Sequence, residues 1–146
     1  MLLQSVTIYV IMEQNMGYQV EVTDSFAAAH QLRGYQGKCE NLHGHNWKVS
    51  VTLFVKQVNK IGMAIDFAEV KRILSAILQE MDHTFLNQHP HFQKNNPTSE
   101  NIARYIFDQF SSHLRDKKVK VAGVSVWESE NCRAIYYSSQ DVVRPF

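Results

Sequence analysis

HGHNWKVSVTLFVK, residues 43–56, is the stretch whose pattern predicts the fold. From Trp47 onward apolar and polar side chains alternate, which is typical of a β-strand with one buried face. The apolar face would carry Trp47, Val49, Val51, Leu53 and Val55, and the polar face Lys48, Ser50, Thr52 and Lys56. Residues 17–30 are β-rich as well, and the connection between the two stretches contains Gly34 and Gly37. We therefore expect an antiparallel hairpin with a long connection.

Two helices are predicted after the hairpin. Asp66 and Glu69 form a D-x-x-E variant of the capping box, so the first helix should begin at Asp66, and its apolar pattern ends near Asp82. The second helix should begin near Thr98, with Glu100 at the favourable end of the helix dipole. The core-facing positions would be Phe67, Val70, Ile73, Leu74, Ile77, Leu78 and Met81 in the first helix, and Ile102, Ile106, Phe107, Phe110 and Leu114 in the second.

The C-terminal part of the chain contains two further strand patterns, residues 118–129 and 132–139, separated by a short polar turn. The element order is therefore β-β-α-α-β-β. This order predicts an α+β domain with a four-stranded antiparallel sheet and two helices on one face. We expect a single domain over residues 17–146, preceded by a short N-terminal extension, residues 1–16.

The composition excludes several classes of protein. The chain has 146 residues, 45% of them hydrophobic, and its 15 Lys and Arg nearly balance its 14 Asp and Glu, so neither a nucleic-acid nor an anionic-membrane surface is expected. Two distant cysteines favour free thiols over a disulfide framework. Residues 1–16 lack the basic start and the cleavage site of a signal peptide, and no stretch is long enough to span a bilayer. We expect a cytoplasmic protein.

The histidines of the predicted hairpin suggest a metal site. His43 and His45 are two residues apart on one strand, so their side chains project from one face. Antiparallel pairing would place His30, at the end of the first strand, opposite them. Three neutral imidazoles with an open fourth position are typical of catalytic zinc, although such residues can also serve only as hydrogen-bonding groups. The second pair, His89 and His91, is separated by Pro90 and is interpreted as solvated surface.

Other polar residues near this predicted site have two interpretations each. Cys39 lies in the connection between the ligand-bearing strands, where it would act either as a fourth metal ligand or as a free base. Asp82 beside His83 would orient that imidazole, or would be a solvated carboxylate at the end of a helix. Glu128 would join the site, or would lie on the polar face of its strand.

Six motifs together resemble the 6-pyruvoyl tetrahydropterin synthase and bacterial 6-carboxytetrahydropterin synthase (queuosine pathway) family. They cover about residues 18–138 and occur in the family's order: FAAAHQL, CENLHGH, AIDFAEVK, MDHTFLN, NPTSENIA and WESENCRAIYY. The resemblance implies a tunnelling fold, in which subunits join their sheets into a trimeric barrel. Two trimers then stack as a hexamer with active sites between subunits.

The resemblance also implies roles for individual residues. By position, His30, His43 and His45 resemble the family's Zn²⁺ ligands, and Cys39 resembles its proton-abstracting residue. Asp82 with His83 resembles the proton-relay pair. Glu128 resembles the carboxylate that binds the pterin ring, and Thr98 would contact the substrate. Lys38 and Arg33 would supply local cations for the substrate's triphosphate.

The implied substrate is 7,8-dihydroneopterin triphosphate, with no nucleic-acid or membrane partner. The expected reaction forms 6-carboxy-5,6,7,8-tetrahydropterin and releases acetaldehyde and triphosphate. A pyruvoyl product is the alternative, as is 6-hydroxymethyldihydropterin, because Glu40 follows Cys39 and a glutamate near this place replaces the cysteine in one branch of the family. A non-catalytic structural zinc protein or pterin-binding module is the alternative from another class.

Overall fold

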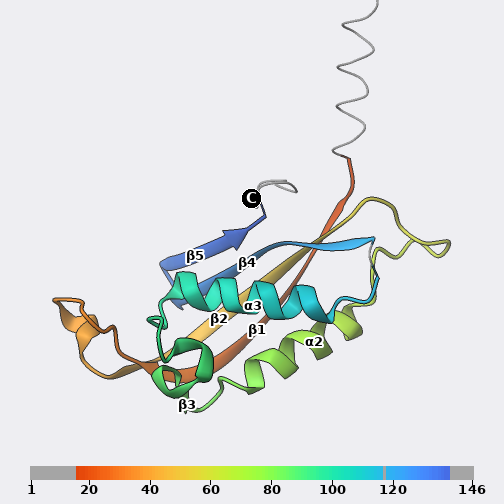
Figure 1. The fold of residues 1–146 in the computed structure, drawn as a ribbon. Coiled ribbons are helices and arrows are strands. Elements are labelled where there is room, and N and C mark those ends of the chain that lie inside the picture. Colours follow the sequence, from red (N-terminus) through yellow and green to blue (C-terminus); the bar gives the residue numbers. More distant parts are fainter. Residues whose placement is uncertain (1–15, 117, 139–146) are drawn as a thin grey trace, which may run out of the picture.

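The computed structural model describes residues 16–116 and 118–138 and has an α+β fold. Its sheet has five strands in the order β3-β1-β2-β4-β5, and both helices lie on one face of it (Figure 1). The strands are β1 (Tyr18–His30), β2 (His43–Val55), β3 (Thr84–Phe85), β4 (Val119–Ser129) and β5 (Cys132–Tyr137), and the helices are α2 (Phe67–Gln79) and α3 (Ser99–His113). The predicted extension, residues 1–16, lies outside the described residues except for Met16.

The predicted number of four strands was wrong because of β3. This two-residue strand pairs in parallel with β1, at Ala28 and Ala29. A strand of two residues is too short to show a period-two pattern in the sequence, so only the tertiary pairing reveals it. The remaining four strands are antiparallel neighbours, as expected.

The hairpin of β1 and β2 is confirmed, and its register is continuous. All 13 residues of β1 pair with β2, from Tyr18 opposite Val55 to His30 opposite His43. Because β2 begins at His43, four residues before the alternating pattern begins, the H-G-H segment belongs to the strand itself. The register therefore places His30 beside the H-G-H segment at one end of the sheet.

Both helices begin where their capping residues predict. The Asp66 carboxylate accepts a hydrogen bond from the N–H of Ala68, and the Thr98 hydroxyl accepts one from the N–H of Asn101. Helix α2 ends at Gln79, slightly before the predicted end. Helix α2 packs on β1, whereas α3 packs on β4 and β5.

The core lies between the sheet and the two helices. Two residues differ from the burial that the sequence predicted for them. Phe67 is the first residue of α2 and is 51% exposed, so the buried side of this helix begins at Val70. Ser50, on the predicted polar face, is buried because β2 is a central strand and Ser50 pairs with Thr23 on one side and Ser125 on the other.

Two connections meet the end of the sheet where the histidines lie. The β1–β2 connection contains the 3-10 turn η1 (Lys38–Glu40) and reaches away from the sheet in orange in Figure 1. The connection from β3 to α3 contains η2 (Leu86–Gln88) and η3 (Pro90–Phe92). Among the described residues, none of the helices combines the length and apolar character needed to span a bilayer.

Candidate metal centre

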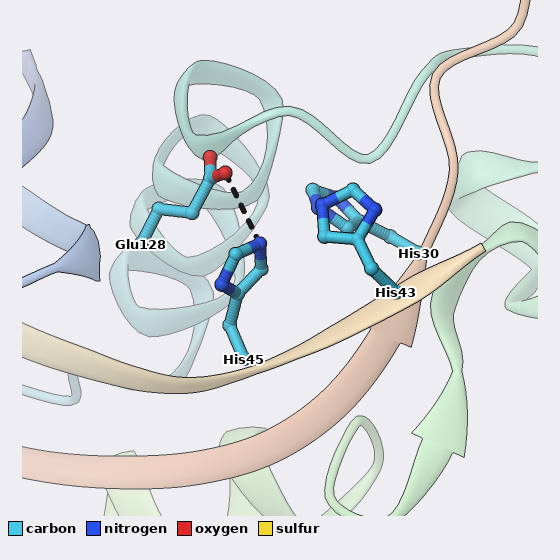
Figure 2. A group of neighbouring side chains, drawn as sticks. All are labelled: His30, His43, His45 and Glu128. Carbon is cyan, nitrogen blue, oxygen red and sulfur yellow. Dashed lines mark hydrogen bonds and ion pairs between the residues drawn. The ribbon is translucent and has the colours of Figure 1, made fainter. Parts of the chain in front are cut away.

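Three histidines converge at the end of the β1–β2 hairpin, as predicted. The side chains of His43 and His45 share the face of β2 that carries Trp47, and His30 meets them from β1 (Figure 2). The His30 and His43 Nε2 atoms are 3.0 Å apart, and the ring centroid of His45 lies 5.1 Å from that of His30 and 4.8 Å from that of His43. The geometry therefore brings three potential nitrogen ligands to one point.

Backbone carbonyls determine which nitrogen of two of these rings carries the proton. His30 Nδ1 lies 2.8 Å from the Pro97 carbonyl, and His43 Nδ1 lies 2.7 Å from the Asn41 carbonyl. A carbonyl only accepts, so each Nδ1 must donate its proton there. In the neutral rings both Nε2 atoms then present lone pairs to each other across 3.0 Å. A cation between them turns this repulsion into attraction, and this tautomer pattern is common around metal-bound histidines.

Glu128 of β4 is the fourth polar group at this point. Its Oε1 lies 3.1 Å from His45 Nε2, and its Oε2 accepts a hydrogen bond from Ser99 Oγ at 3.2 Å. The contact with His45 is close but is not aligned as a hydrogen bond, so the buried His45 Nε2 has no hydrogen-bond partner. A buried nitrogen without a partner is costly unless something else binds it. A metal ion would satisfy it.

Burial favours the neutral form of His30 and His45, which is the form that binds metals. Desolvation lowers the pKa of His30 below its ordinary value, against the opposing effect of the Pro97 carbonyl. Desolvation also lowers the pKa of His45, against the opposing effect of the Glu128 carboxylate. Trp47 lies beneath both rings with its centroid 4.9 Å from His30 and 5.1 Å from His45, and it is fully buried.

These four residues form a group that can hold a metal ion. One ligand atom from each of His30, His43, His45 and Glu128 lies within 4.8 Å of all the others. Three neutral nitrogens and one carboxylate oxygen match the ligands that borderline-soft divalent ions such as zinc prefer. The donor set and the orphaned nitrogen therefore both fit a metal.

Cys39 lies outside this group. It is half-buried in η1, and its carbonyl accepts a hydrogen bond from the Leu32 N–H at 2.9 Å. The fourth polar member of the group is Glu128 instead. The neighbouring Glu40 is exposed.

Asp82 and His83 form the predicted pair at the edge of β1. His83 Nδ1 lies 2.9 Å from Asp82 Oδ2, while Asp82 Oδ1 accepts the N–H of Ala27 at 2.9 Å. This N–H bond is the main reason that the pKa of Asp82 lies below its ordinary value, and the His83 imidazole lowers it further. His83 has a left-handed backbone, with φ of 55°, and its side chain is 81% exposed. The pair is thus oriented, and its imidazole faces outward.

The residues predicted to contact the rest of the substrate differ in whether their side chains are already engaged within the protein. Thr98 caps α3, and Lys38 is exposed in η1. Arg33, which its charge suggests as a second cation for a triphosphate, donates instead to the backbone carbonyls of Phe92, Gln93 and Asn95. Lys38 therefore remains the freer cation of the two.

The second histidine pair is only partly solvated, so that prediction was half wrong. His91 is exposed, but His89 is half-buried, and desolvation lowers its pKa. The ring centroids of His89 and His91 lie 5.1 Å and 4.7 Å from that of Tyr105. Both rings therefore contact Tyr105 of α3, although only His89 is partly withdrawn from water.

Several residues that shape the centre were not found from single-residue patterns. Ser99 holds Glu128, and the carbonyls of Pro97 and Asn41 orient two of the histidines. The spacing of side-chain types along the sequence does not reveal which backbone carbonyls will contact the histidines. Ser99 belongs to the N-P-T-S run before α3, a capping pattern that marks the position without revealing the contact.

An α+β fold with three histidines and a glutamate gathered at one end of its sheet is the arrangement of a protein with a metal-binding site, and comparison with known proteins identifies the family. A model of the family described as 6-pyruvoyl tetrahydropterin synthase matches residues 19–139. The chain belongs to the 6-pyruvoyl tetrahydropterin synthase family.

Individual relatives agree with this assignment. The chain is 41% identical to the putative 6-carboxy-5,6,7,8-tetrahydropterin synthase of Archaeoglobus fulgidus, over 77% of this chain and 89% of that one. It is 32% identical to the 6-carboxy-5,6,7,8-tetrahydropterin synthase of Haemophilus influenzae, over 77% and 93%. The solved 6-pyruvoyl tetrahydropterin synthase of Caenorhabditis elegans superimposes with a TM-score of 0.76 at 30% identity, covering 85% of this chain and 97% of that one.

Replacing any one of His30, His43 and His45 by alanine should sharply lower the divalent-metal content, because each removes one nitrogen of a three-nitrogen set. Elemental analysis of the purified variants measures this. His89→Ala and His91→Ala are the matched controls and should retain the wild-type content. Full metal content in His30→Ala would contradict the assignment of the β1 histidine to the centre.

Proposed function

We propose that this protein is a zinc-dependent 6-carboxy-5,6,7,8-tetrahydropterin synthase acting on 7,8-dihydroneopterin triphosphate. The observation that carries the proposal is the group of His30, His43, His45 and Glu128, whose inward nitrogens are placed to bind a cation. The product would be the carboxy-pterin of queuosine biosynthesis, with acetaldehyde and triphosphate released.

The choice of product is supported by the relatives. The Archaeoglobus and Haemophilus proteins are both named for the carboxy product, at 41% and 32% identity. The Caenorhabditis structure named for the pyruvoyl product is 30% identical. Cys39 is present where the resemblance places the proton-abstracting residue, and the adjacent Glu40 is exposed, which favours a solvated role for that glutamate.

Zinc, held by the three histidines, would supply Lewis-acid polarisation of the substrate's side-chain hydroxyls. The protein's own part in binding begins with Glu128. Its two carboxylate oxygens can accept a pair of parallel N–H bonds from the guanidine-like edge of a pterin. Ser99 holds this carboxylate through Oε2, so the group is oriented before substrate arrives. Because Oε1 contacts His45, a pterin bound by Glu128 would lie next to the metal centre.

Proton transfer would be divided between two elements. Cys39 would take a proton from the substrate side chain, and His83 would return one, oriented through Nδ1 by Asp82. The His83 side chain is 81% exposed at the edge of β1, which supports its action in a site shared between subunits. The triphosphate would be bound by Lys38, with Thr98 contacting the substrate at the start of α3.

A homotrimeric barrel, or a hexamer of two such trimers, is part of the proposal. Within residues 16–116 and 118–138, β1 is an edge strand beyond the two residues paired with β3, and β5 is the opposite edge. Open edges of this kind are normally paired or covered. The pairing of β5 with β1 of another copy would satisfy both edges and bring the exposed His83 to a neighbouring subunit.

The purified protein should convert 7,8-dihydroneopterin triphosphate to 6-carboxy-5,6,7,8-tetrahydropterin with release of one acetaldehyde. Mass spectrometry of the pterin and an assay of acetaldehyde measure the outcome. Removal of the metal by a chelator should abolish turnover, and added zinc should restore it. A 6-pyruvoyl or 6-hydroxymethyl pterin as the main product would contradict the assigned reaction.

Cys39→Ala should keep the bound metal and lose most turnover, because the three histidines remain while no group of suitable basicity replaces the thiolate. Metal analysis and single-turnover kinetics measure the two effects separately. Cys132→Ala, which changes the exposed cysteine of β5, is the control. Loss of metal from Cys39→Ala would instead make Cys39 a ligand.

Glu128→Gln should keep the fold but weaken dihydropterin binding by about 2–4 kcal/mol, because the amide loses the charge and can no longer accept two N–H bonds. Titration calorimetry with a dihydropterin measures the loss. The neighbouring Glu130→Gln, at an exposed turn position, should bind normally. Unchanged affinity in Glu128→Gln would remove Glu128 from the pterin site.

A further inference from the structure

The chain that follows His30 is bound along both of its edges. On one edge, Asn87 accepts the Gln31 N–H at 3.0 Å and donates to the Gln31 carbonyl at 2.9 Å. Two residues later, Asn96 makes the same pair of bonds with Arg33, both at 2.9 Å. On the other edge, the N–H of the intervening Leu32 donates to the Cys39 carbonyl at 2.9 Å.

These contacts continue the β-ladder after the strand has ended. A primary amide carries an acceptor and a donor, so one asparagine side chain can replace a peptide group of a neighbouring strand. β3 pairs with Ala28 and Ala29, and the two asparagines then take over at Gln31 and Arg33 along the connection that follows β3. Residues 31–33 are thereby held without a partner strand on that edge.

Asn96 also anchors the chain directly before the carbonyl that orients His30. Its own carbonyl accepts bonds from Asn101 Nδ2 at 2.8 Å and from the Thr98 N–H at 2.9 Å. Pro97 lies between these anchored residues, and its carbonyl receives the His30 Nδ1 proton at 2.8 Å. Asn96 thus contacts both segments that form the His30–Pro97 contact. Its side chain binds the chain after His30, and its backbone precedes the Pro97 carbonyl that His30 faces.

We propose that Asn96, assisted by Asn87, is a positioning residue that keeps His30 Nε2 directed at the metal. The proposal rests on the proposed function, because it assumes a metal bound by the three histidines. The Leu32–Cys39 bond extends the same restraint to the turn that carries the proposed base. Neither asparagine contacts the metal group, so both act through the backbone.

Loss of the Asn96 amide would leave the N–H and carbonyl of Arg33 without this partner and would free the connection before α3. The Pro97 carbonyl would then be held only by the bonds that the Asn96 backbone carbonyl accepts from Asn101 and Thr98, so the restraint on the Nδ1–H tautomer of His30 would weaken. Removal of such outer partners typically lowers metal affinity 10- to 100-fold. A purely structural role in the loop would lower thermal stability without changing the ligand field of the bound metal.

The test compares Asn96→Ala with Asn95→Ala. Asn95 is the adjacent residue of the same type, is exposed, and uses its side chain only for a 3.4 Å contact with the His91 carbonyl. Zinc affinity is measured by competition with a chromophoric chelator, and the ligand field by the visible absorption of the Co²⁺-substituted protein. We expect Asn96→Ala to lose affinity on the order of tenfold and to show an altered Co²⁺ spectrum, whereas Asn95→Ala matches wild type.

Asn87→Ala is the second variant, and it decides the matter if Asn96→Ala does not fold. It should show the same changes in smaller degree, because it leaves the Pro97 contact in place. Zinc affinity within twofold of wild type, with an unchanged Co²⁺ spectrum, in the folded variants would overturn the positioning role while leaving the proposed function intact. Equal losses in Asn95→Ala would also overturn it, and a wild-type protein that binds no zinc would overturn both proposals.

Discussion

Two imidazole lone pairs, on His30 Nε2 and His43 Nε2, face each other across 3.0 Å at the end of the sheet. Backbone carbonyls hold the proton of each ring on its other nitrogen, so the rings cannot relieve the repulsion by changing tautomer without breaking those bonds. Burial disfavours adding a proton to His30. A shared cation would satisfy all of these constraints together.

The rigidity behind this arrangement comes from the hairpin. The pairing of β1 with β2 runs without interruption over 13 residues, so the relative positions of His30 and His43 are determined by backbone hydrogen bonds. Trp47 fills the space beneath the rings and donates its Nε1–H to the Ala28 carbonyl at 3.2 Å. A close-packed base of this kind limits the rotamers that the histidines can adopt.

The polar groups around this base come from separate elements. Glu128 lies near the C-terminal end of β4, Ser99 begins α3, and Cys39 belongs to the β1–β2 connection. Asp82 and His83 lie apart from them on the edge of β1, tied to Ala27. The fold thus supplies one rigid end of a sheet, and segments distant in the sequence supply the groups that would select a substrate and transfer protons.

Local sequence patterns were enough to predict much of the fold and part of the metal centre. The alternation from Trp47 predicted β2, the H-x-H spacing placed His43 and His45 on one face, and Asp66 and Thr98 marked the helix starts. These features depend on the period of a strand or on a cap two or three residues away, so they can be read without knowing the path of the chain.

Other features were decided only by the tertiary structure. The two-residue β3, the approach of Glu128 to His45 and the bonds from Arg33 to loop carbonyls all join segments that are between 56 and 83 residues apart in the sequence. Such contacts depend on where the connections run after the core has packed. Backbone carbonyls occur at every residue, so nothing in the sequence distinguishes the ones that orient His30 and His43.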